Sequence, residues 1–202
     1  MANLLHFFEL TIIGLLLFSN AETLKRKRSV IVEEYYETNC PDCRLYFLSN
    51  IWPNYLKMRD DVEFVMVPFG NARLVNKSVV CQHGTEECYG NAYHACTMDK
   101  YGLSTMMQLA YCMFNSVFYY KDTIVAKQCA VSLKLNHSYL DSCARGAYGF
   151  QLILKMANKT DSLVPKHRWV PWTLVNNKYT HGNLYSYICT NYKRYVKACK
   201  KH

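Results

Sequence analysis

The sequence predicts an α/β fold in which a strand–helix–strand unit and a strand–strand–helix unit flank a cysteine-rich helical insertion. Three observations carry this prediction. A strand pattern runs directly into Cys40-Pro41-Asp42-Cys43, a second strand pattern follows the helix after it, and strand patterns return after residue 165. This order of elements fits one domain in which helices pack on a sheet.

The first unit is built around the two cysteines Cys40 and Cys43. Residues 30–36 are rich in β-branched and aromatic side chains, which predicts a buried strand. Residues 44–58 carry apolar side chains at the spacing of a helix. Residues 62–68 alternate in polarity and predict a second strand. Together they form a βαβ unit, in which we expect the two strands to be parallel.

The insertion covers about residues 71–165 and is braced by disulfides in our interpretation. Residues 103–120 have the composition of a buried helix, and residues 140–157 predict a further helix. Beyond the insertion, residues 170–180 predict two short strands joined by a turn at Asn176-Asn177.

The last predicted element is an amphipathic helix from Leu184 to Val196. With it the chain has the order of a thioredoxin-like fold that carries an insertion. In such a fold the proline that opens the third strand, here Pro171, is cis and faces the dithiol. Val170 then offers its backbone to an extended peptide substrate by strand addition. The alternative is an ordinary trans proline on an edge strand.

The chain contains ten cysteines, which points to an oxidising compartment, where disulfides persist. If Cys40 and Cys43 are redox-active, the other eight cysteines form four bridges, for which 105 pairings exist. Cys189 and Cys199 flank the last predicted helix, so they pair only if its end unwinds.

The spacing of Cys40 and Cys43 at a strand-to-helix corner is typical of redox-active dithiols. The free N–H groups and the dipole of the helix start favour a thiolate on Cys40, which we expect to face solvent and attack a substrate disulfide. Cys43, tucked into the first turn, would resolve the mixed disulfide. Asp42 would oppose the thiolate until acid neutralises its charge, which makes it a candidate for tuning the pKa of Cys40. Its alternative role is to cap the helix.

The N-terminus has the composition of a signal peptide over residues 1–21, with cleavage after Ala21. The alternative is a retained membrane anchor, but the apolar run is shorter than a bilayer span requires. Residues 22–28 contain four consecutive basic residues and are either a cleaved propeptide or a flexible arm. The thioredoxin-like domain would cover residues 29–202, with no membrane span after signal cleavage.

The formal net charge is +9, but the basic residues are dispersed and lack a nucleic-acid-binding motif. We therefore expect no nucleic-acid partner. Three sequons, at Asn76, Asn136 and Asn158, predict N-linked glycans on surface loops.

The segment Cys81–Cys96 resembles a known signature, Cys-Gln-His-Gly-x2-Glu-Cys-x2-Asn-x4-Cys, at every fixed position. That signature marks the gamma-interferon-inducible lysosomal thiol reductase family. The resemblance extends from the Cys40 corner through residues 67–72 to Val170-Pro171-Trp172. It implies a soluble, glycosylated thiol reductase that acts on disulfide-bonded protein substrates, secreted or in the acidic lumen of endosomes and lysosomes. An external thiol or another reductant would regenerate the enzyme.

The signature segment has two further interpretations. Cys81, His83, Cys88 and Cys96 could ligate a metal, but their spacing matches no common zinc motif, so we predict no metal and no cofactor. We expect His83 and Glu87 to hydrogen-bond within the loop and shape it. A histidine becomes cationic in acid, so His83 is also a candidate acid sensor.

Two other functions compete with the reductase. One is a secretory oxidase or isomerase, which shares the fold and differs in redox poise. The other is a secreted binding or immune protein in which Cys40 and Cys43 form a non-catalytic disulfide. Loss of turnover in Cys40→Ser would separate the enzymes from the binding protein.

Overall fold

The computed structural model describes residues 30–200. The predicted signal peptide at residues 1–21 and the basic segment at residues 22–28 lie outside the described residues. Within the described part of the chain, no helix is both long and apolar enough to cross a membrane.

A four-stranded mixed sheet forms the centre of the fold, in the order β2-β1-β5-β6. The strands are β1 (Val30–Tyr36), β2 (Val62–Pro68), β5 (Trp172–Val175) and β6 (Lys178–Thr180). Strand β1 is parallel to β2 and antiparallel to β5, which confirms the predicted βαβ unit. Asn176 and Asn177 both have positive φ and form the predicted turn between β5 and β6.

The helical stretch after β1 is longer than predicted. It consists of α2 (Pro41–Tyr46), a π-helical segment (Phe47–Ile51) and α3 (Trp52–Met58). It begins at Pro41 rather than Arg44 because proline suits the first position of a helix, where no N–H bond is needed. The helix therefore starts directly at the first cysteine.

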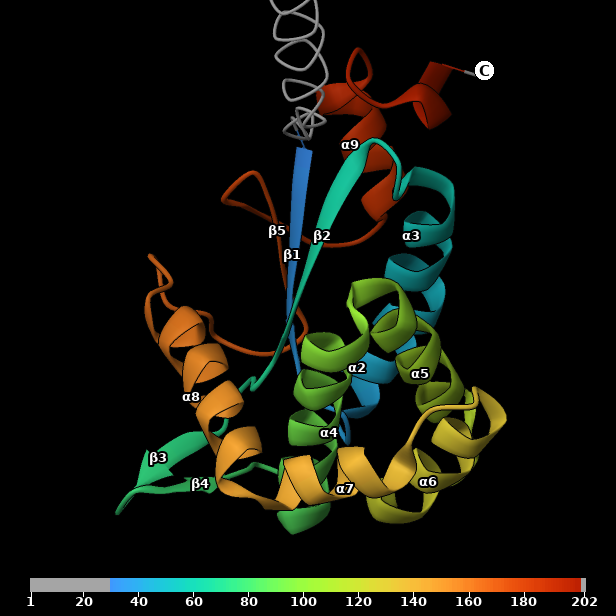
Figure 1. Cartoon of the computed structure of the whole chain (residues 1–202). Coiled ribbons are helices and arrows are strands. Elements are labelled where there is room, and N and C mark those ends of the chain that lie inside the picture. The colour runs from blue at the N-terminus through green and yellow to red at the C-terminus, as the bar shows by residue number, and fades with distance from the viewer. Residues whose placement is uncertain (1–29, 201–202) are drawn as a thin grey trace, which may run out of the picture.

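The segment between β2 and β5 contains a hairpin and five α-helices. They are β3 (Arg73–Val75), β4 (Ser78–Val80), α4 (Thr85–Tyr101), α5 (Leu103–Asn115), α6 (Asp122–Ser132), α7 (His137–Arg145) and α8 (Ala147–Asp161). In Figure 1, α8 lies to the left of the central strands and α5 to their right, α7 and α6 run along the bottom beside α4, and the β3–β4 hairpin projects at the lower left.

Two predicted helices have different bounds in the structure. The helix expected over residues 103–120 ends at Asn115, because Ser116 adopts extended backbone. The helix expected over residues 140–157 is two helices, α7 and α8, which Gly146 separates with its own extended backbone. The hairpin, α4 and α6 were not predicted. Helix α4 is buried on most sides, so it lacks the single apolar stripe that marks an amphipathic helix.

The eight other cysteines form four disulfides, as predicted: Cys81–Cys88, Cys96–Cys143, Cys112–Cys129 and Cys189–Cys199. The last bridge closes because α9 (Leu184–Tyr192) ends before the predicted Val196, and a 3₁₀ turn (Lys197–Lys200) brings Cys199 back. Two of the bridges join helices of the insertion, α4 to α7 and α5 to α6. The alternative in which Cys81, Cys88 and Cys96 ligate a metal is wrong, since their sulfurs are in disulfides.

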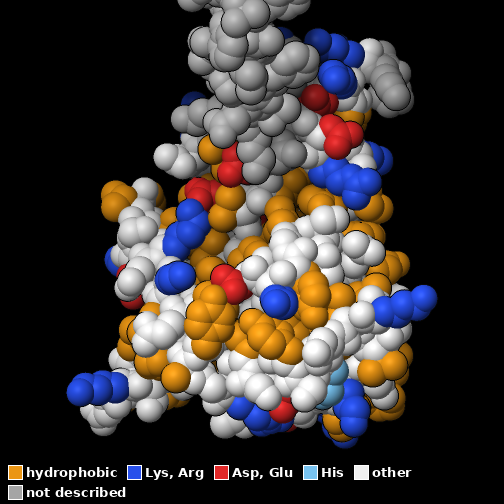
Figure 2. All heavy atoms as spheres, in the orientation of Figure 1, with side chains coloured by type: hydrophobic (Ala, Val, Ile, Leu, Met, Phe, Trp, Pro, Cys, Tyr) orange, Lys and Arg blue, Asp and Glu red, His pale blue; other side chains and the backbone are white. Residues whose placement is uncertain are grey.

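Two main clusters of buried side chains stabilise the fold. One lies between the sheet and helices α2, α3, α5 and α9, and it includes Cys40 and Cys43. The other lies within the insertion, around α4. The dithiol therefore belongs to the core that the sheet shares with the insertion. On the face shown in Figure 2, Lys and Arg side chains are scattered around a central area of hydrophobic side chains.

All three sequon asparagines are exposed. Asn76 lies in the tight turn of the β3–β4 hairpin, and Asn136 is the N-cap of α7. Asn158 lies within α8 rather than in the surface loop that was expected.

Candidate active site

Cys40 and Cys43 lie at the first turn of α2, directly after β1. Cys40 is the N-cap residue, and its Sγ accepts a hydrogen bond from the backbone N–H of Cys43 at 3.1 Å. Within residues 30–200, these two are the cysteines that form no disulfide. The helix start thus presents an N–H group to the first sulfur, as the sequence pattern predicted.

The two thiols differ in acidity. The pKa of Cys40 is lowered, mainly by a hydrogen bond from the Cys43 side chain and also by the Cys43 N–H, although burial opposes both effects. The pKa of Cys43 is raised well above its ordinary value, first by burial and then by Cys40. Cys40 is therefore the thiol that more readily becomes a thiolate, which is the form that attacks disulfides.

The expectation that Cys40 faces solvent is wrong. Cys40 is 5% exposed and Cys43 is 1% exposed, so both are buried. The cover over Cys40 includes the loop before β5, because the Sγ of Cys40 lies 3.9 Å from the carbonyl oxygen of Val170.

The peptide bond between Val170 and Pro171 is cis, as predicted. A second cis bond, Val164–Pro165, lies in the same loop region. Beside Val170 and Pro171 is a pocket of about 440 Å³, whose lining includes Leu45 and Tyr46 of α2 and Trp169. Leu45 and Trp169 remain about half exposed, at 59% and 47%. This pocket adjoins Val170, whose carbonyl group lies over Cys40, and part of its lining is apolar.

Asp42 lies in the first turn of α2 and is exposed. The capping alternative is wrong, because the N-cap is Cys40 and its sulfur makes the capping hydrogen bond. The charge of Asp42 raises the pKa of Cys40, in the predicted direction, but the charge of Glu37 does so more strongly. Tuning by Asp42 stays a prediction.

Buried carboxyl groups near the dithiol were missed in the sequence. Glu34 of β1 is 2% exposed, and burial raises its pKa to about 8 despite a 2.6 Å hydrogen bond from Thr173. The charge of Glu34 raises the pKa of Cys43, and the charge of the Cys40 thiolate raises the pKa of Glu34, since like charges oppose each other. The available signal was two adjacent glutamates, Glu33 and Glu34, inside a strand that otherwise reads as buried.

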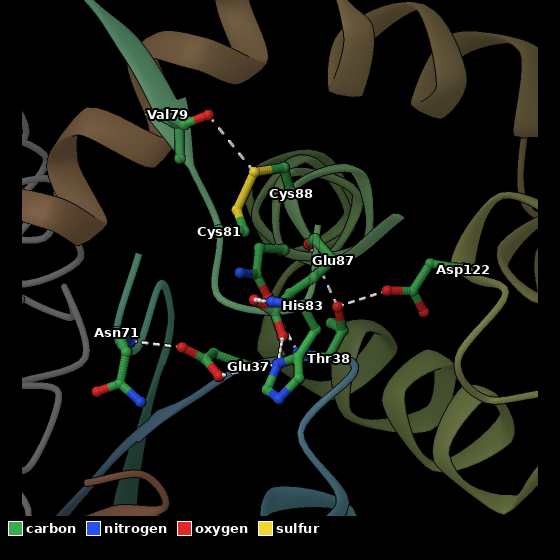
Figure 3. The surroundings of a disulfide bond; sticks show 10 residues. Glu37, Thr38, Asn71, Val79, Cys81, His83, Glu87, Cys88 and Asp122 are labelled. Carbon is green, nitrogen blue, oxygen red and sulfur yellow. Dashed lines mark hydrogen bonds and ion pairs between the residues drawn. A yellow bond between two sulfur atoms is a disulfide. The ribbon is translucent and has the colours of Figure 1, made fainter. Parts of the chain in front are cut away.

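A second group of buried carboxyls surrounds His83. The Nδ1 of His83 lies 2.5 Å from the Oε2 of Glu87 and 3.4 Å from the Oε2 of Glu37. The backbone N–H of His83 also donates to Glu87 at 3.1 Å, which confirms the predicted shaping of the loop. We call Glu37, His83 and Glu87 the acid cluster. Figure 3 shows the His83 ring between the two carboxyl groups.

Within the described ranges, the acid cluster is also the one group of three side chains placed closely enough to bracket a metal ion. Its geometry is that of hydrogen bonding. The 2.5 Å between His83 and Glu87 is shorter than the roughly 3.3 Å that separates two ligands of one tetrahedral zinc.

The fold and the dithiol define a class of protein, the thioredoxin-like thiol-disulfide oxidoreductases. The structure is similar to that of oxidised BdbD from Bacillus subtilis, with a TM-score of 0.64 and 17% sequence identity over 87% of this chain and 90% of that one. An identity this low establishes the fold alone.

Sequence relatives specify the family. The family model for gamma interferon inducible lysosomal thiol reductase matches residues 31–133. The chain is 30% identical to the gamma-interferon-inducible lysosomal thiol reductase of Carassius auratus, over 81% of this chain and 69% of that protein. It is 32% identical to the protein of the same name from Mus musculus, over 81% and 68%. The chain belongs to this family, and it is a thiol-disulfide oxidoreductase.

Proposed function

We propose that this protein reduces disulfide bonds of protein substrates at acidic pH, with Cys40 as the nucleophile and Cys43 as the resolving thiol. The observation that carries the proposal is the unequal pair at the start of α2. Cys40 has a lowered pKa and accepts the Cys43 N–H, whereas burial raises the pKa of Cys43. The first thiol is thus prepared to attack, and the second is kept protonated until a mixed disulfide forms.

The reaction proceeds in two exchanges. The Cys40 thiolate attacks one sulfur of the substrate disulfide, a new S–S bond forms, and the other substrate sulfur leaves as a thiolate and takes up a proton. Cys43 then loses its proton and attacks the Cys40 sulfur, which releases the second substrate thiolate. The substrate gains two electrons and two protons, and Cys40 and Cys43 end as a disulfide. An external thiol or another reductant returns them to the dithiol.

The substrate-binding role belongs to Val170 and Pro171 in this proposal. The Val170 carbonyl already lies at the Cys40 sulfur, so an extended chain that adds to this backbone would bring its disulfide to the same place. The adjoining pocket, lined by Leu45 and Trp169, suits an apolar side chain next to the substrate cysteine. Extended and apolar segments are accessible mainly in unfolded proteins.

An endosomal or lysosomal lumen, or secretion, is the proposed location. Support comes from the names of the relatives, from four disulfides, and from exposed sequons at Asn76, Asn136 and Asn158. An ordinary thiol would hold about one thiolate in three thousand at pH 5. The lowered pKa of Cys40 offsets part of this deficit.

Reduction of a denatured, disulfide-bonded protein tests the proposal. Turnover is measured at about pH 4.5 and about pH 7 for the wild type, Cys40→Ser and Cys43→Ser. We expect turnover in acid that requires Cys40, and a trapped mixed disulfide in Cys43→Ser. Turnover that is absent at both pH values in the wild type would favour the binding or immune protein with a non-catalytic dithiol. Oxidation of reduced substrates faster than reduction of oxidised ones would favour the oxidase or isomerase.

A further inference from the structure

Glu37 of the acid cluster is fixed in a close-fitting environment. It follows β1, its side chain is fully buried, and its Oε1 accepts the backbone N–H of Asn71 at 2.5 Å. Gly70 has a φ of +59°, and a Cβ there would lie 2.3 Å from the Cγ of Glu37. The Oε2 of Glu37 has no hydrogen-bond partner and faces His83 at 3.4 Å. The carboxyl group therefore cannot turn away from the cluster without moving the backbone.

The signature segment holds the other two members of the cluster. His83 lies inside the loop that the Cys81–Cys88 disulfide closes, and Glu87 lies in the first turn of α4 beside Cys88. Glu87 is fully buried, whereas the side chain of His83 is 33% exposed. His83 is thus the member of the cluster that reaches solvent. The reaction of the two thiols gives no role to the Cys81–Cys96 signature segment, whereas the acid cluster uses two of its residues.

The acid cluster is connected to Cys40 through the loop between β1 and α2. Glu37 precedes Cys40 by three residues, and its charge raises the pKa of the Cys40 thiol. The next residue, Thr38, ties this loop to α4 and α6, since its Oγ1 lies 3.4 Å from the Glu87 carbonyl oxygen and 2.5 Å from the Oδ2 of Asp122. Figure 3 shows this chain of contacts from Asn71 to Asp122.

The other charged groups around the cluster are mostly acidic. Glu86 of α4 and the buried Asp122 of α6 lie on the Glu87 side. His167, from the loop before β5, reaches the cluster through the Oδ1 of Asn71 at 3.1 Å. On the dithiol side, Asp42 of α2 raises the pKa of Cys40 and Glu34 of β1 raises that of Cys43. A proton taken up by the cluster therefore removes negative charge from an already negative environment.

We propose that Glu37, held by His83 and Glu87, is a positioning residue that makes the reactivity of Cys40 depend on acidity. The cluster takes up a proton as the surroundings become acidic, and this withdraws the negative charge that opposes the Cys40 thiolate. The inference rests on the proposed role of Cys40 as the nucleophile. It places the main sensor of acid at Glu37, which affects Cys40 more strongly than the exposed Asp42 does, while tuning by Asp42 stays a separate prediction.

The charge balance gives the direction of the effect. Burial raises the pKa of Glu37 to about 7, the charge of Glu87 adds to the rise, and the Asn71 N–H and His83 oppose it. Glu37 is thus ionised above about pH 7 and neutral in acid. The Cys40 thiolate becomes scarcer as pH falls, and loss of the Glu37 charge offsets part of that decline.

The test is the rate at which iodoacetamide alkylates Cys40 in a Cys43→Ser background, measured across the range from acid to alkaline pH. We expect the profile to contain a second inflection near the pKa of Glu37, about 7, besides that of the thiol. Glu37→Gln keeps an acceptor for the Asn71 N–H and should abolish this inflection. Between this inflection and the pKa of the thiol, the variant should react about three- to tenfold faster, as expected for a thiol pKa lowered by half a unit to one unit.

The neighbours of Glu37 should move the inflection in opposite directions. Glu87→Gln removes a neighbour that raises the pKa of Glu37 and should shift the inflection to lower pH, whereas His83→Gln removes a neighbour that lowers this pKa and should shift it to higher pH. A merely structural role predicts no such opposed shifts. Glu86→Gln is the matched control, because Glu86 lies in the same turn of α4 but bonds to Thr123, and its profile should equal that of the parent.

An unchanged profile in Glu37→Gln would overturn the inference while leaving the proposed function intact. Absence of Cys40 alkylation in every variant would overturn the proposed function instead. If Glu37→Gln loses its near-ultraviolet circular dichroism, the opposed shifts of the Glu87 and His83 variants decide the question. Equal shifts, or none, would then count against the inference.

Discussion

The Sγ of Cys40 lies 3.9 Å from the carbonyl oxygen of Val170, a residue 130 positions further along the chain. This contact joins the start of α2 to the loop before β5 and closes the surface over the thiol. It also means that the backbone nearest to the nucleophile is the backbone that precedes the cis proline. In the proposed function, access to the thiol and binding of a polypeptide would therefore both depend on this loop.

Trp169→Ala should impair protein substrates selectively. Trp169 lines the pocket beside Pro171 and stacks edge-on against Trp172, with ring centroids 5.7 Å apart. We expect a KM for a denatured protein raised about tenfold, because an apolar contact of about 1.4 kcal/mol is lost. The rate with a small, soluble disulfide should stay unchanged. Tyr195→Ala, an exposed aromatic residue outside this pocket, is the control; equal effects of the two changes would contradict the assignment.

Glu34→Gln should stabilise the protein in mildly alkaline solution. The pKa of Glu34 is raised from 4.5 to about 8, so the folded state favours the protonated form. The free energy of unfolding therefore falls as pH rises from about 4.5 towards 8, by an amount on the order of 3 to 5 kcal/mol. The variant should lack this part of the decline and match the wild type near pH 4.5. Urea titrations at several pH values in this range measure the free energy of unfolding. The same pH dependence in both proteins would contradict the prediction.

His94→Gln should change stability on the acid side. His94 is fully buried, its Nδ1 lies 2.9 Å from the Tyr36 hydroxyl, and burial lowers its pKa from 6.5 to about 3. The unfolded chain binds a proton below about pH 6.5 and the folded chain does not, so stability is lost as pH falls towards 3. The wild type should lose several kcal/mol from this group. The melting temperature of the variant should therefore fall less steeply with decreasing pH than that of the wild type, even if its stability near pH 7 is lower.

Gly70→Ala should disturb the acid cluster from outside. The added Cβ would lie 2.3 Å from the Cγ of Glu37, at a backbone with positive φ. We expect a loss of about 2 to 4 kcal/mol in the free energy of unfolding, from strain and displacement together.

Gly182→Ala separates the two contributions, because Gly182 also has positive φ but a Cβ there meets nothing within 4 Å. It should lose only the backbone part, about 1 to 2 kcal/mol. Only Gly70→Ala should also shift the alkylation profile of Cys40. Similar losses in the free energy of unfolding of both variants would show that the Glu37 side chain moves aside at no measurable cost.

Local patterns predicted the elements whose environment is simple. The strand at residues 30–36, the dithiol corner and the turn at Asn176-Asn177 follow from β-branched residues, cysteine spacing and adjacent asparagines. Helix α4 escaped prediction because it is surrounded by other helices, so polar residues such as Asn91 and His94 are buried in it with apolar ones. The pattern of one apolar face exists only where the other face meets water.

The sequence by itself determined the family, the two cysteines that stay outside the structural disulfides (Cys40 and Cys43), the number of those disulfides and the place of the cis proline. These depend on residue types at fixed short spacings. Only the tertiary structure decided which cysteines pair, that Cys40 is covered by Val170, and that Glu37 meets His83 and Glu87. The physical reason is that burial and the proximity of charges depend on contacts between segments far apart in the chain. Burial and nearby charges set the pKa of a thiol, and the residues next to it in the sequence do not determine either of them.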